Sequence, residues 1–233
     1  MRIGIIGAGL VGGTLALRLH ALGHEIKVAN SRGPATLRQL AEESGARAVT
    51  AAEAVRDVDV IFISIPEVRV PELSRQLFAE VPPHVVVVDT GNYFPRERDG
   101  FIEEIEAGMT ESAWVARRIG RPVVKAFNNI GARALRERGR ERGSPNRIAL
   151  PVAGDRRADK SLVLRLADEL GFDGVDAGTL EDSWRQQPGT PVFATDLNAD
   201  GVRHALTVAS AMRRPAFRGT RQRDGPSPST RAG

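Results

Sequence analysis

The residues whose spacing most clearly points to chemistry are three glycines near the amino terminus. Gly7, Gly9 and Gly12 form the pattern G-x-G-x-x-G, which follows an apolar run at residues 3–6 and precedes leucines at helical spacing. In this setting the first glycine allows a tight turn, the second lets a ligand approach the backbone, and the third lets helix and strand pack closely. The free N–H groups at the start of a helix attract anions. The spacing therefore predicts a loop that binds the pyrophosphate of a dinucleotide.

The end of the second predicted strand, residues 25–29, indicates which dinucleotide binds. NAD sites usually have an Asp or Glu there, which accepts hydrogen bonds from the ribose hydroxyls. This chain has Asn30, followed by Ser31 and Arg32. A carboxylate would repel a 2′-phosphate by roughly 4 kcal/mol at about 4 Å and an effective dielectric constant of about 20, whereas a guanidinium can hold it with paired hydrogen bonds. The sequence favours NADP(H); the alternative is a solvated turn before the helix that Pro34 begins.

Alternating strand and helix patterns predict the architecture that positions these residues. We expect an α/β, Rossmann-type fold: a doubly wound, mostly parallel sheet in the order 3-2-1-4-5-6, with helices on both faces and a small C-terminal extension. Apolar runs at residues 58–65 and 85–88 predict buried parallel strands, and Thr50 with Glu53 predicts a capping box. The expected parts are an NADP-binding Rossmann domain over residues 1–146, a C-terminal part over 147–214 that completes the pocket, and a disordered basic tail over 215–233.

Ligands of such sheets collect outside the carboxyl ends of the strands. Residues 64–66, 89–92 and 125–129 end predicted strands on that side, so we expect them to border the nicotinamide. Asp89 predicts a turn-stabilising carboxylate, and the loop at residues 184–193 is either a cover for a planar ligand or an ordinary surface loop. The residues predicted to bind cofactor are Gly7, Ala8, Gly9, Leu10, Val11, Gly12, Asn30, Ser31, Arg32, Ile65, Pro66, Thr90, Asn92, Ala126 and Asn128.

The amino-acid composition excludes several kinds of catalytic and binding site. The 233 residues include no cysteine and four histidines, which excludes disulfides, thiolate metal sites and a cysteine nucleophile. No pair of histidines has metal-ligand spacing, so we expect no metal. There is no apolar run of about 18 residues and no signal-peptide pattern, so we expect a cytoplasmic protein without a membrane partner. The net charge of +4 comes largely from residues 215–233, so we expect no nucleic-acid partner.

Four segments, at residues 7–13, 30–32, 150–155 and 176–178, together resemble the NADP-dependent oxidoreductases of the deazaflavin coenzyme F420 and their bacterial relatives. The likeness spans roughly residues 1–212. It implies direct hydride transfer between NADPH and a second planar cofactor, with Ser31 and Arg32 on the 2′-phosphate and a homodimer as the assembly. Ala8 and Leu10 stand where archaeal members have Thr and Asn, so FMN, FAD or another acceptor stays open beside deazaflavin.

No catalytic residue is evident, and the candidates are Lys125, Asn128 and Asn129. β-Hydroxyacid dehydrogenases use a lysine with an asparagine four residues later, the spacing of Lys125 and Asn129. In this chain the two residues fall across a predicted strand end, and only a few dozen residues follow Gly178 where those enzymes carry a helical domain of about a hundred residues. A non-catalytic NADP(H) redox sensor is the alternative from a different class, because fold alone does not define function.

Overall fold

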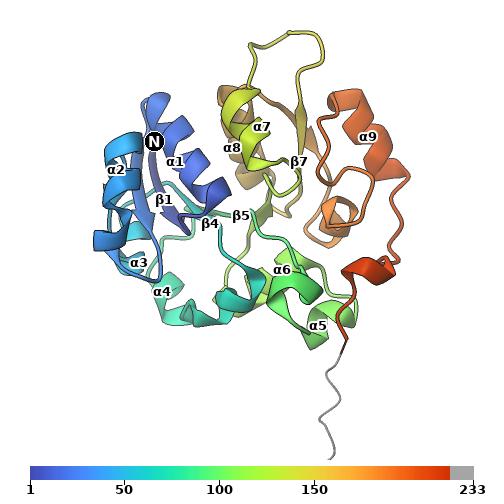
Figure 1. The fold of residues 1–233 in the computed structure, drawn as a ribbon, viewed down its shortest axis with the longest axis horizontal. Coiled ribbons are helices and arrows are strands. Elements are labelled where there is room, and N and C mark those ends of the chain that lie inside the picture. The colour runs from blue at the N-terminus through green and yellow to red at the C-terminus, as the bar shows by residue number, and fades with distance from the viewer. Residues whose placement is uncertain (221–233) are drawn as a thin grey trace, which may run out of the picture.

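Residues 1–220 are described in the computed structural model (Figure 1). Within them, six parallel strands form one sheet in the order β3-β2-β1-β4-β5-β6, as the sequence predicts. The strands are β1 (Arg2–Ile6), β2 (Glu25–Ala29), β3 (Arg47–Ala48), β4 (Val60–Ile63), β5 (Val86–Asp89) and β6 (Val124–Lys125). The α-helices of this part are α1 (Leu10–Ala21), α2 (Arg38–Ser44), α3 (Ala51–Ala54), α4 (Arg75–Ala79), α5 (Glu103–Glu106), α6 (Glu111–Ile119) and α7 (Ala132–Glu137).

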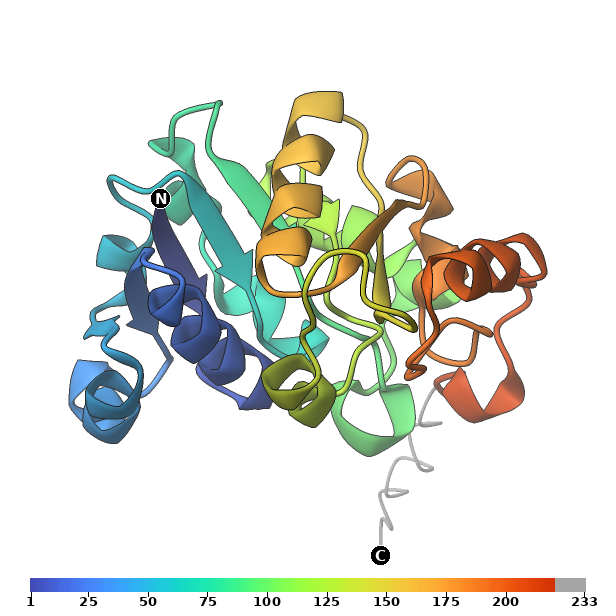
Figure 2. The ribbon, with the colours of Figure 1, turned by 90° about the horizontal axis from the view of Figure 1, so that it is seen from above.

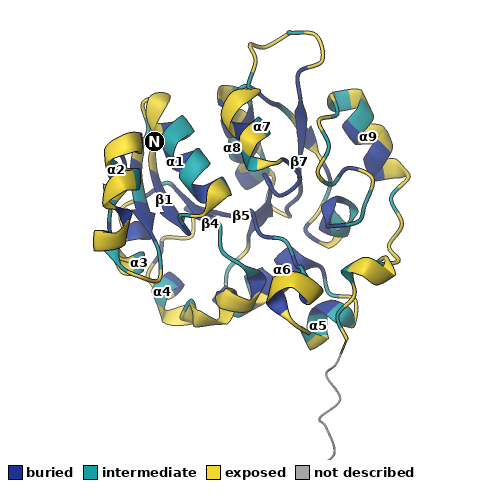
Figure 3. Cartoon of the chain, viewed as in Figure 1, coloured by how far each residue is buried: buried dark blue, intermediate teal, exposed yellow. Residues whose placement is uncertain are grey.

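Helices cover both faces of this sheet because successive side chains of a strand point to opposite sides. On one face, Ile3, Phe62 and Val88 pack with side chains of α1 and α7. On the other face, Ile61 and Val87 pack with α3, α4 and α6. Figure 3 shows the strands as the most deeply buried part of the chain, with exposed residues on the outer sides of the helices. The doubly wound Rossmann-type arrangement is confirmed.

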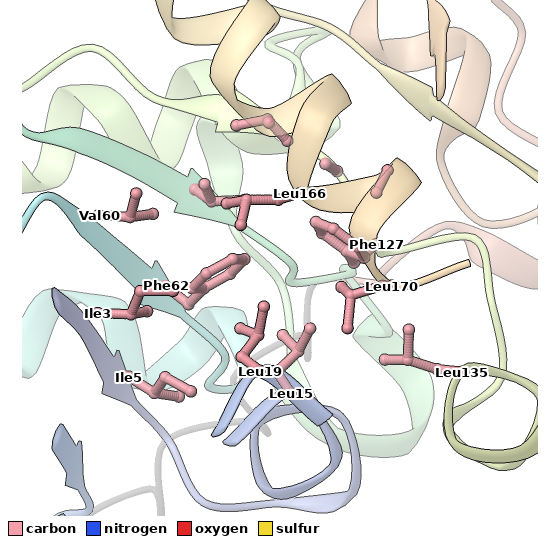
Figure 4. Close-up of a cluster of buried hydrophobic side chains, with 14 of the residues drawn as sticks. Ile3, Ile5, Leu15, Leu19, Val60, Phe62, Phe127, Leu135, Leu166 and Leu170 are labelled. Atoms are coloured by element: carbon pink, nitrogen blue, oxygen red, sulfur yellow. The ribbon is translucent and has the colours of Figure 1, made fainter. Parts of the chain in front are cut away.

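A second, smaller sheet follows along the chain. Strands β7 (Ala149–Val152) and β8 (Asp173–Asp176) are parallel and are joined by α8 (Arg157–Glu169). An antiparallel bridge links Lys125 of β6 to Ala153, with N–H···O distances of 2.8 and 3.0 Å. Leu166 and Leu170 pack in the same core as Ile3 and Leu15 (Figure 4). The C-terminal part therefore packs directly against the Rossmann domain, as the view from above also shows (Figure 2).

The other face of the small sheet is covered by α9 (Ala199–Thr207), through Val202, Ala205 and Leu206. The helix ends at Thr207, and an irregular segment leads back toward α5 and α6 (Figure 1). Shorter turns complete the described chain: the 3-10 helices η1 (Pro34–Leu37), η2 (Glu67–Glu72), η4 (Glu181–Gln186) and η5 (Pro215–Phe217), and the π-helical turn η3 (Pro95–Asp99). No helix within residues 1–220 is long and apolar enough to span a bilayer.

The prediction of a disordered tail from residue 215 is wrong for residues 215–220. Arg96 donates to the carbonyls of Pro215 and Arg218 at 2.9 and 3.2 Å. The Phe217 ring packs closely on Gly189: a Cβ added to Gly189 would lie 2.6 Å from the nearest carbon of that ring. Composition suggested disorder, but contacts with distant loops order these six residues. The rest of the predicted tail, 221–233, lies outside the described residues.

Candidate functional site

The glycine loop between β1 and α1 combines two tightly packed glycines with an open one. Gly7 has φ +110°, and a Cβ on it would lie 2.2 Å from the Ser64 carbonyl oxygen. A Cβ on Gly12 would lie 1.9 Å from the Gly7 oxygen, whereas one on Gly9 would meet nothing within 4 Å. Gly9 caps α1 without any side-chain hydrogen bond. The open space therefore lies beside uncapped N–H groups, an arrangement that fits a pyrophosphate.

A groove of about 550 Å³ begins at this loop. One wall comes from the turn after β2, the other from the segment after β4, because these strands flank β1 in the sheet. The predicted cofactor residues that line it are Gly7, Ala8, Gly9, Asn30, Ser31, Arg32, Ile65 and Pro66. Leu10, at the first position of α1, is 83% exposed. Eight residues chosen from separate sequence motifs thus share one groove.

The Asn30 side chain shapes the turn that presents Ser31 and Arg32. Its Oδ1 accepts a hydrogen bond from the Arg32 N–H at 3.0 Å, and its Nδ2 donates to Thr36 Oγ1 at 2.9 Å. Thr36, which the sequence reasoning missed, also donates to the Gly33 carbonyl at 2.8 Å. Ser31 and Arg32 are exposed, and neither side chain has a hydrogen-bond or ion-pair partner within residues 1–220. Asn30 is therefore the support of the turn, and the two residues after it are free to contact a ligand.

Asn92 and Asn128 meet at the carboxyl ends of β5 and β6. Asn128 Nδ2 donates to Asn92 Oδ1 at 3.0 Å and to the Gln186 carbonyl at 2.7 Å, and Gln186 Nε2 returns a bond to Asn128 Oδ1 at 2.9 Å. Gln186 comes from η4, inside the irregular loop that the sequence singled out. The amides thus tie that loop to the Rossmann sheet. Of the other predicted cofactor residues, Ala126 has no exposed surface and Thr90 is buried with its hydroxyl on the Ile63 carbonyl.

Asn129 is the clearest unsatisfied polar group on this side. It is buried, and neither its Oδ1 nor its Nδ2 has a hydrogen-bond partner among the described residues. The preceding turn depends on Phe127, which adopts φ +61° and packs edge-on against Phe62 with ring centroids 5.8 Å apart. A buried amide with both polar atoms unpaired needs a ligand or an ordered water as partner.

Lys125 is fully buried, and its partners come from β5, the turn after β5 and α6. Its Nζ donates to the Gly91 carbonyl at 2.6 Å and to Asp89 Oδ2 at 3.2 Å, and it lies 3.8 Å from Glu111 Oε2. Burial lowers the pKa of Lys125, but the charges of Asp89 and Glu111 outweigh it and the pKa is raised. The ammonium therefore holds the turn after β5, and Lys125 shares no partner with Asn129.

Asp89 stabilises this turn through its carboxylate, as the sequence predicts. Its Oδ1 accepts from the Gly91 N–H at 2.9 Å, and its Oδ2 accepts from the Ser112 hydroxyl at 2.5 Å. Glu111 continues the cluster toward the C-terminal segment, because its Oε1 pairs with Arg213 at 3.1 Å. Arg213 in turn donates to Gln187 Oε1 at 3.0 Å. Sequence reasoning missed Ser112, Glu111 and Arg213, since no local pattern links them to residue 89.

Glu67 is a second feature that the sequence did not reveal. It follows Pro66 directly, is fully buried, and neither carboxyl oxygen has a hydrogen-bond partner within residues 1–220. A Cβ on Gly91 would lie 2.7 Å from its Oε1 and 3.0 Å from Asp89 Oδ1. Burial, reinforced by the charge of Asp89, raises the pKa of Glu67 well above its usual range. The fold therefore favours the protonated form of this carboxyl group.

Comparison with known proteins identifies the family. Residues 2–93, which include β1, the groove and the turn after β5, match the family model described as NADP oxidoreductase, coenzyme F420-dependent. Hypothetical protein SMa0349 from Sinorhizobium meliloti is 30% identical, with a TM-score of 0.74 over 85% of this chain and 95% of that one. The chain belongs to this oxidoreductase family.

Two further proteins resemble the chain in fold or over part of its sequence. A structure from Arthrobacter sp. FB24, provisionally assigned as an F420-dependent NADP reductase, is 23% identical, with a TM-score of 0.63 over 78% of this chain and 86% of that one; it supports the shared fold. YjhV of Escherichia coli (strain K12) is 40% identical over 67 residues, which are 29% of this chain. The match spans about half (49%) of the length of that curated relative. No group of three or more His, Asp or Glu side chains within residues 1–220 could hold a metal ion.

Substitution by alanine should separate the two kinds of glycine in the loop. Gly12→Ala places a Cβ 1.9 Å from a backbone oxygen, so we expect it to lower the free energy of unfolding by about 1–3 kcal/mol. Gly9→Ala meets no protein atom, so its stability should match that of the wild type while dinucleotide binding is lost. Denaturant unfolding and NADPH titration of both variants test this expectation. Wild-type NADPH affinity in Gly9→Ala would contradict the assignment of the open space.

Glu67→Gln should change how stability depends on pH. The unfolded chain releases the Glu67 proton at a lower pH than the folded chain, because the fold raises the pKa of this carboxyl. Wild-type stability should therefore fall as pH rises from the unfolded toward the folded pKa, and the amide variant should lack this part of the decline. Denaturant unfolding between about pH 5 and 8 measures it, with Glu42→Gln at an exposed position as the control. Identical pH profiles for the wild type and Glu67→Gln would show that folding does not raise the pKa of Glu67.

Proposed function

We propose that this chain transfers a hydride between NADPH and a second planar redox cofactor, with the deazaflavin coenzyme F420 as the first candidate and FMN or FAD as the others. The observation that carries the proposal is the groove at the ends of β1, β2 and β4. It combines an open Gly9, a free Arg32 guanidinium, and an amide in place of a carboxylate at position 30. The family description supports NADP and F420 as the reacting pair.

The chain's own residues would hold NADP(H) as follows. The first-turn N–H groups of α1 would bind the pyrophosphate, and Ser31 and Arg32 would bind the 2′-phosphate. Ile65 and Pro66 would contact the nucleotide where the groove continues past β4. The bound dinucleotide supplies the hydride chemistry itself, so the protein needs to provide orientation and exclusion of water.

The unpaired Asn129 amide is the side chain we propose to contact a bound ligand near the hydride. Its buried oxygen and nitrogen offer one acceptor and two donors, which suit a carboxamide or a ring carbonyl. Lys125 acts differently: with its ammonium bound to Gly91 and Asp89, it positions the turn after β5. We also propose that residues 147–214 complete the acceptor pocket, because Gln186 binds Asn128 and the Phe193 ring lies 6.2 Å from that of Phe94.

Activity is tested by mixing the protein with NADPH and F420, FMN or FAD in turn and following NADPH absorbance. We expect oxidation of NADPH, fastest with F420. Tight NADPH binding without oxidation by any of the three would contradict hydride transfer to a flavin-like acceptor and favour the redox-sensor alternative. The Gly9→Ala variant is the control for turnover at the proposed groove.

Arg32→Ala tests the choice of nucleotide. Loss of charge-assisted hydrogen bonds of about 1.5–3 kcal/mol corresponds to a roughly 10- to 150-fold weaker NADPH affinity, while NADH affinity should stay within about twofold. Dissociation constants from fluorescence titration measure both. Arg47→Ala, which removes the same charge from the amino end of β3, should leave both affinities unchanged. An equal loss for NADPH and NADH in Arg32→Ala would contradict the phosphate contact.

A further inference from the structure

The wall of the groove opposite Arg32 carries a second arginine. Arg69 and Glu72 line the same groove as Ser31 and Arg32, and they pair with each other at 2.8 Å. Their side chains are 51% and 49% exposed. The pair lies in η2, directly after Pro66, so it enters the groove from the β4 side.

The backbone of η2 is anchored, although the ion pair on it is not. The Arg69 N–H donates to the Pro66 carbonyl at 3.0 Å, and Val70 is buried in the core. The Val68 N–H donates to the buried Asp99 carboxylate at 3.2 Å. A 3-10 helix has three residues per turn, so residues 69 and 72 stand directly above one another. The segment thus holds the Arg69 stem in place and leaves its guanidinium at the groove.

The Arg69–Glu72 pair is weak enough to exchange. Pairs this exposed contribute about 0–1 kcal/mol, because water screens the charges and two long side chains lose freedom. A phosphate monoester carries a charge of about −1.5 to −2 at neutral pH and offers three acceptor oxygens, more than one carboxylate does. A 2′-phosphate in this groove would therefore compete successfully for the guanidinium.

We propose that Arg69 is a second specificity-determining residue for NADP(H). When the nucleotide binds, the Arg69 guanidinium exchanges its ion pair with Glu72 for a contact with the 2′-phosphate. This inference rests on the proposed function, in which the groove holds NADP(H). Glu72 then has a defined part: it holds Arg69 when the groove is free, and its negative charge opposes the phosphate. Of the three charged side chains that line the groove, Arg32 and Arg69 favour the phosphate and Glu72 disfavours it.

Two neutral substitutions of the pair test the proposal in opposite directions. In Glu72→Gln, NADPH affinity should rise about three- to tenfold at low salt, because a repulsive charge is removed and Arg69 is released. In Arg69→Gln, NADPH affinity should fall by a similar factor. NADH affinity should change by less than about twofold in both variants, because NADH lacks the 2′-phosphate.

The chain offers a matched control on α9. Arg203 and Asp200 also form an exposed pair three residues apart, at 2.8 Å, and neither lines the groove. Asp200→Asn changes the net charge by the same amount as Glu72→Gln and should leave both affinities unchanged. If it raises NADPH affinity as much as Glu72→Gln does, the effect is one of overall charge and the proposal is wrong.

Further outcomes separate this inference from the proposed function. If Arg32→Ala removes the preference for NADPH but neither Arg69→Gln nor Glu72→Gln alters the NADPH-to-NADH affinity ratio, Arg69 has no part in specificity and only this inference fails. Equal losses of NADPH and NADH affinity in Arg69→Gln also overturn the inference, since they indicate that Arg69 does not contact the 2′-phosphate. If wild-type protein binds neither nucleotide, the proposed function itself fails.

Discussion

The buried ammonium of Lys125 is the interaction on which the ligand side of this structure depends. It joins β6 to the turn after β5 and to α6 through Gly91, Asp89 and Glu111. Glu111 extends the connection to Arg213, which brings in the C-terminal segment. Taking such charges out of water costs several kcal/mol per ion, so each is tolerated only while its partners are present. The cluster therefore couples β6, the turn after β5, α6 and the C-terminal segment.

The charge balance of this cluster helps to explain why the pKa of Glu67 is raised. Lys125 and Arg213 supply two positive charges, and Asp89 and Glu111 supply two negative ones. A third carboxylate beside Asp89 would be buried without a cation of its own. This cost favours the protonated form of Glu67, in agreement with its raised pKa and with the absence of a hydrogen-bond partner for its oxygens within residues 1–220. The raised pKa of Glu67 and the pairing of Lys125 thus have the same cause, which is burial beneath the turns after β5 and β6.

Local patterns predicted most of the fold and eight of the residues that line the groove. The Thr50–Glu53 capping box follows from residues close together in sequence, and the order of six strands follows from the rules of parallel sheets. The glycine loop was predictable because its backbone needs are local: Gly7 requires positive φ, and Gly12 has no room for a Cβ. The ordered conformation of residues 215–220 was not predictable from local patterns, since Phe217 and Gly219 depend on contacts with Gly189 and Glu106.

The sequence by itself determined that a dinucleotide loop precedes a turn with Asn30 in place of an acid, because backbone space and the sign of a charge are properties of individual residues. Only the tertiary structure decided which groups lie next to Lys125, Glu67 and Arg69. Lys125 has the spacing of a catalytic residue, yet its partners come from β5 and α6 and bury it. Arg69 has no motif, yet the β2-β1-β4 order places it across the groove from Arg32. Charged side chains acquire their roles from the groups that fold next to them, and those groups lie far apart in the chain.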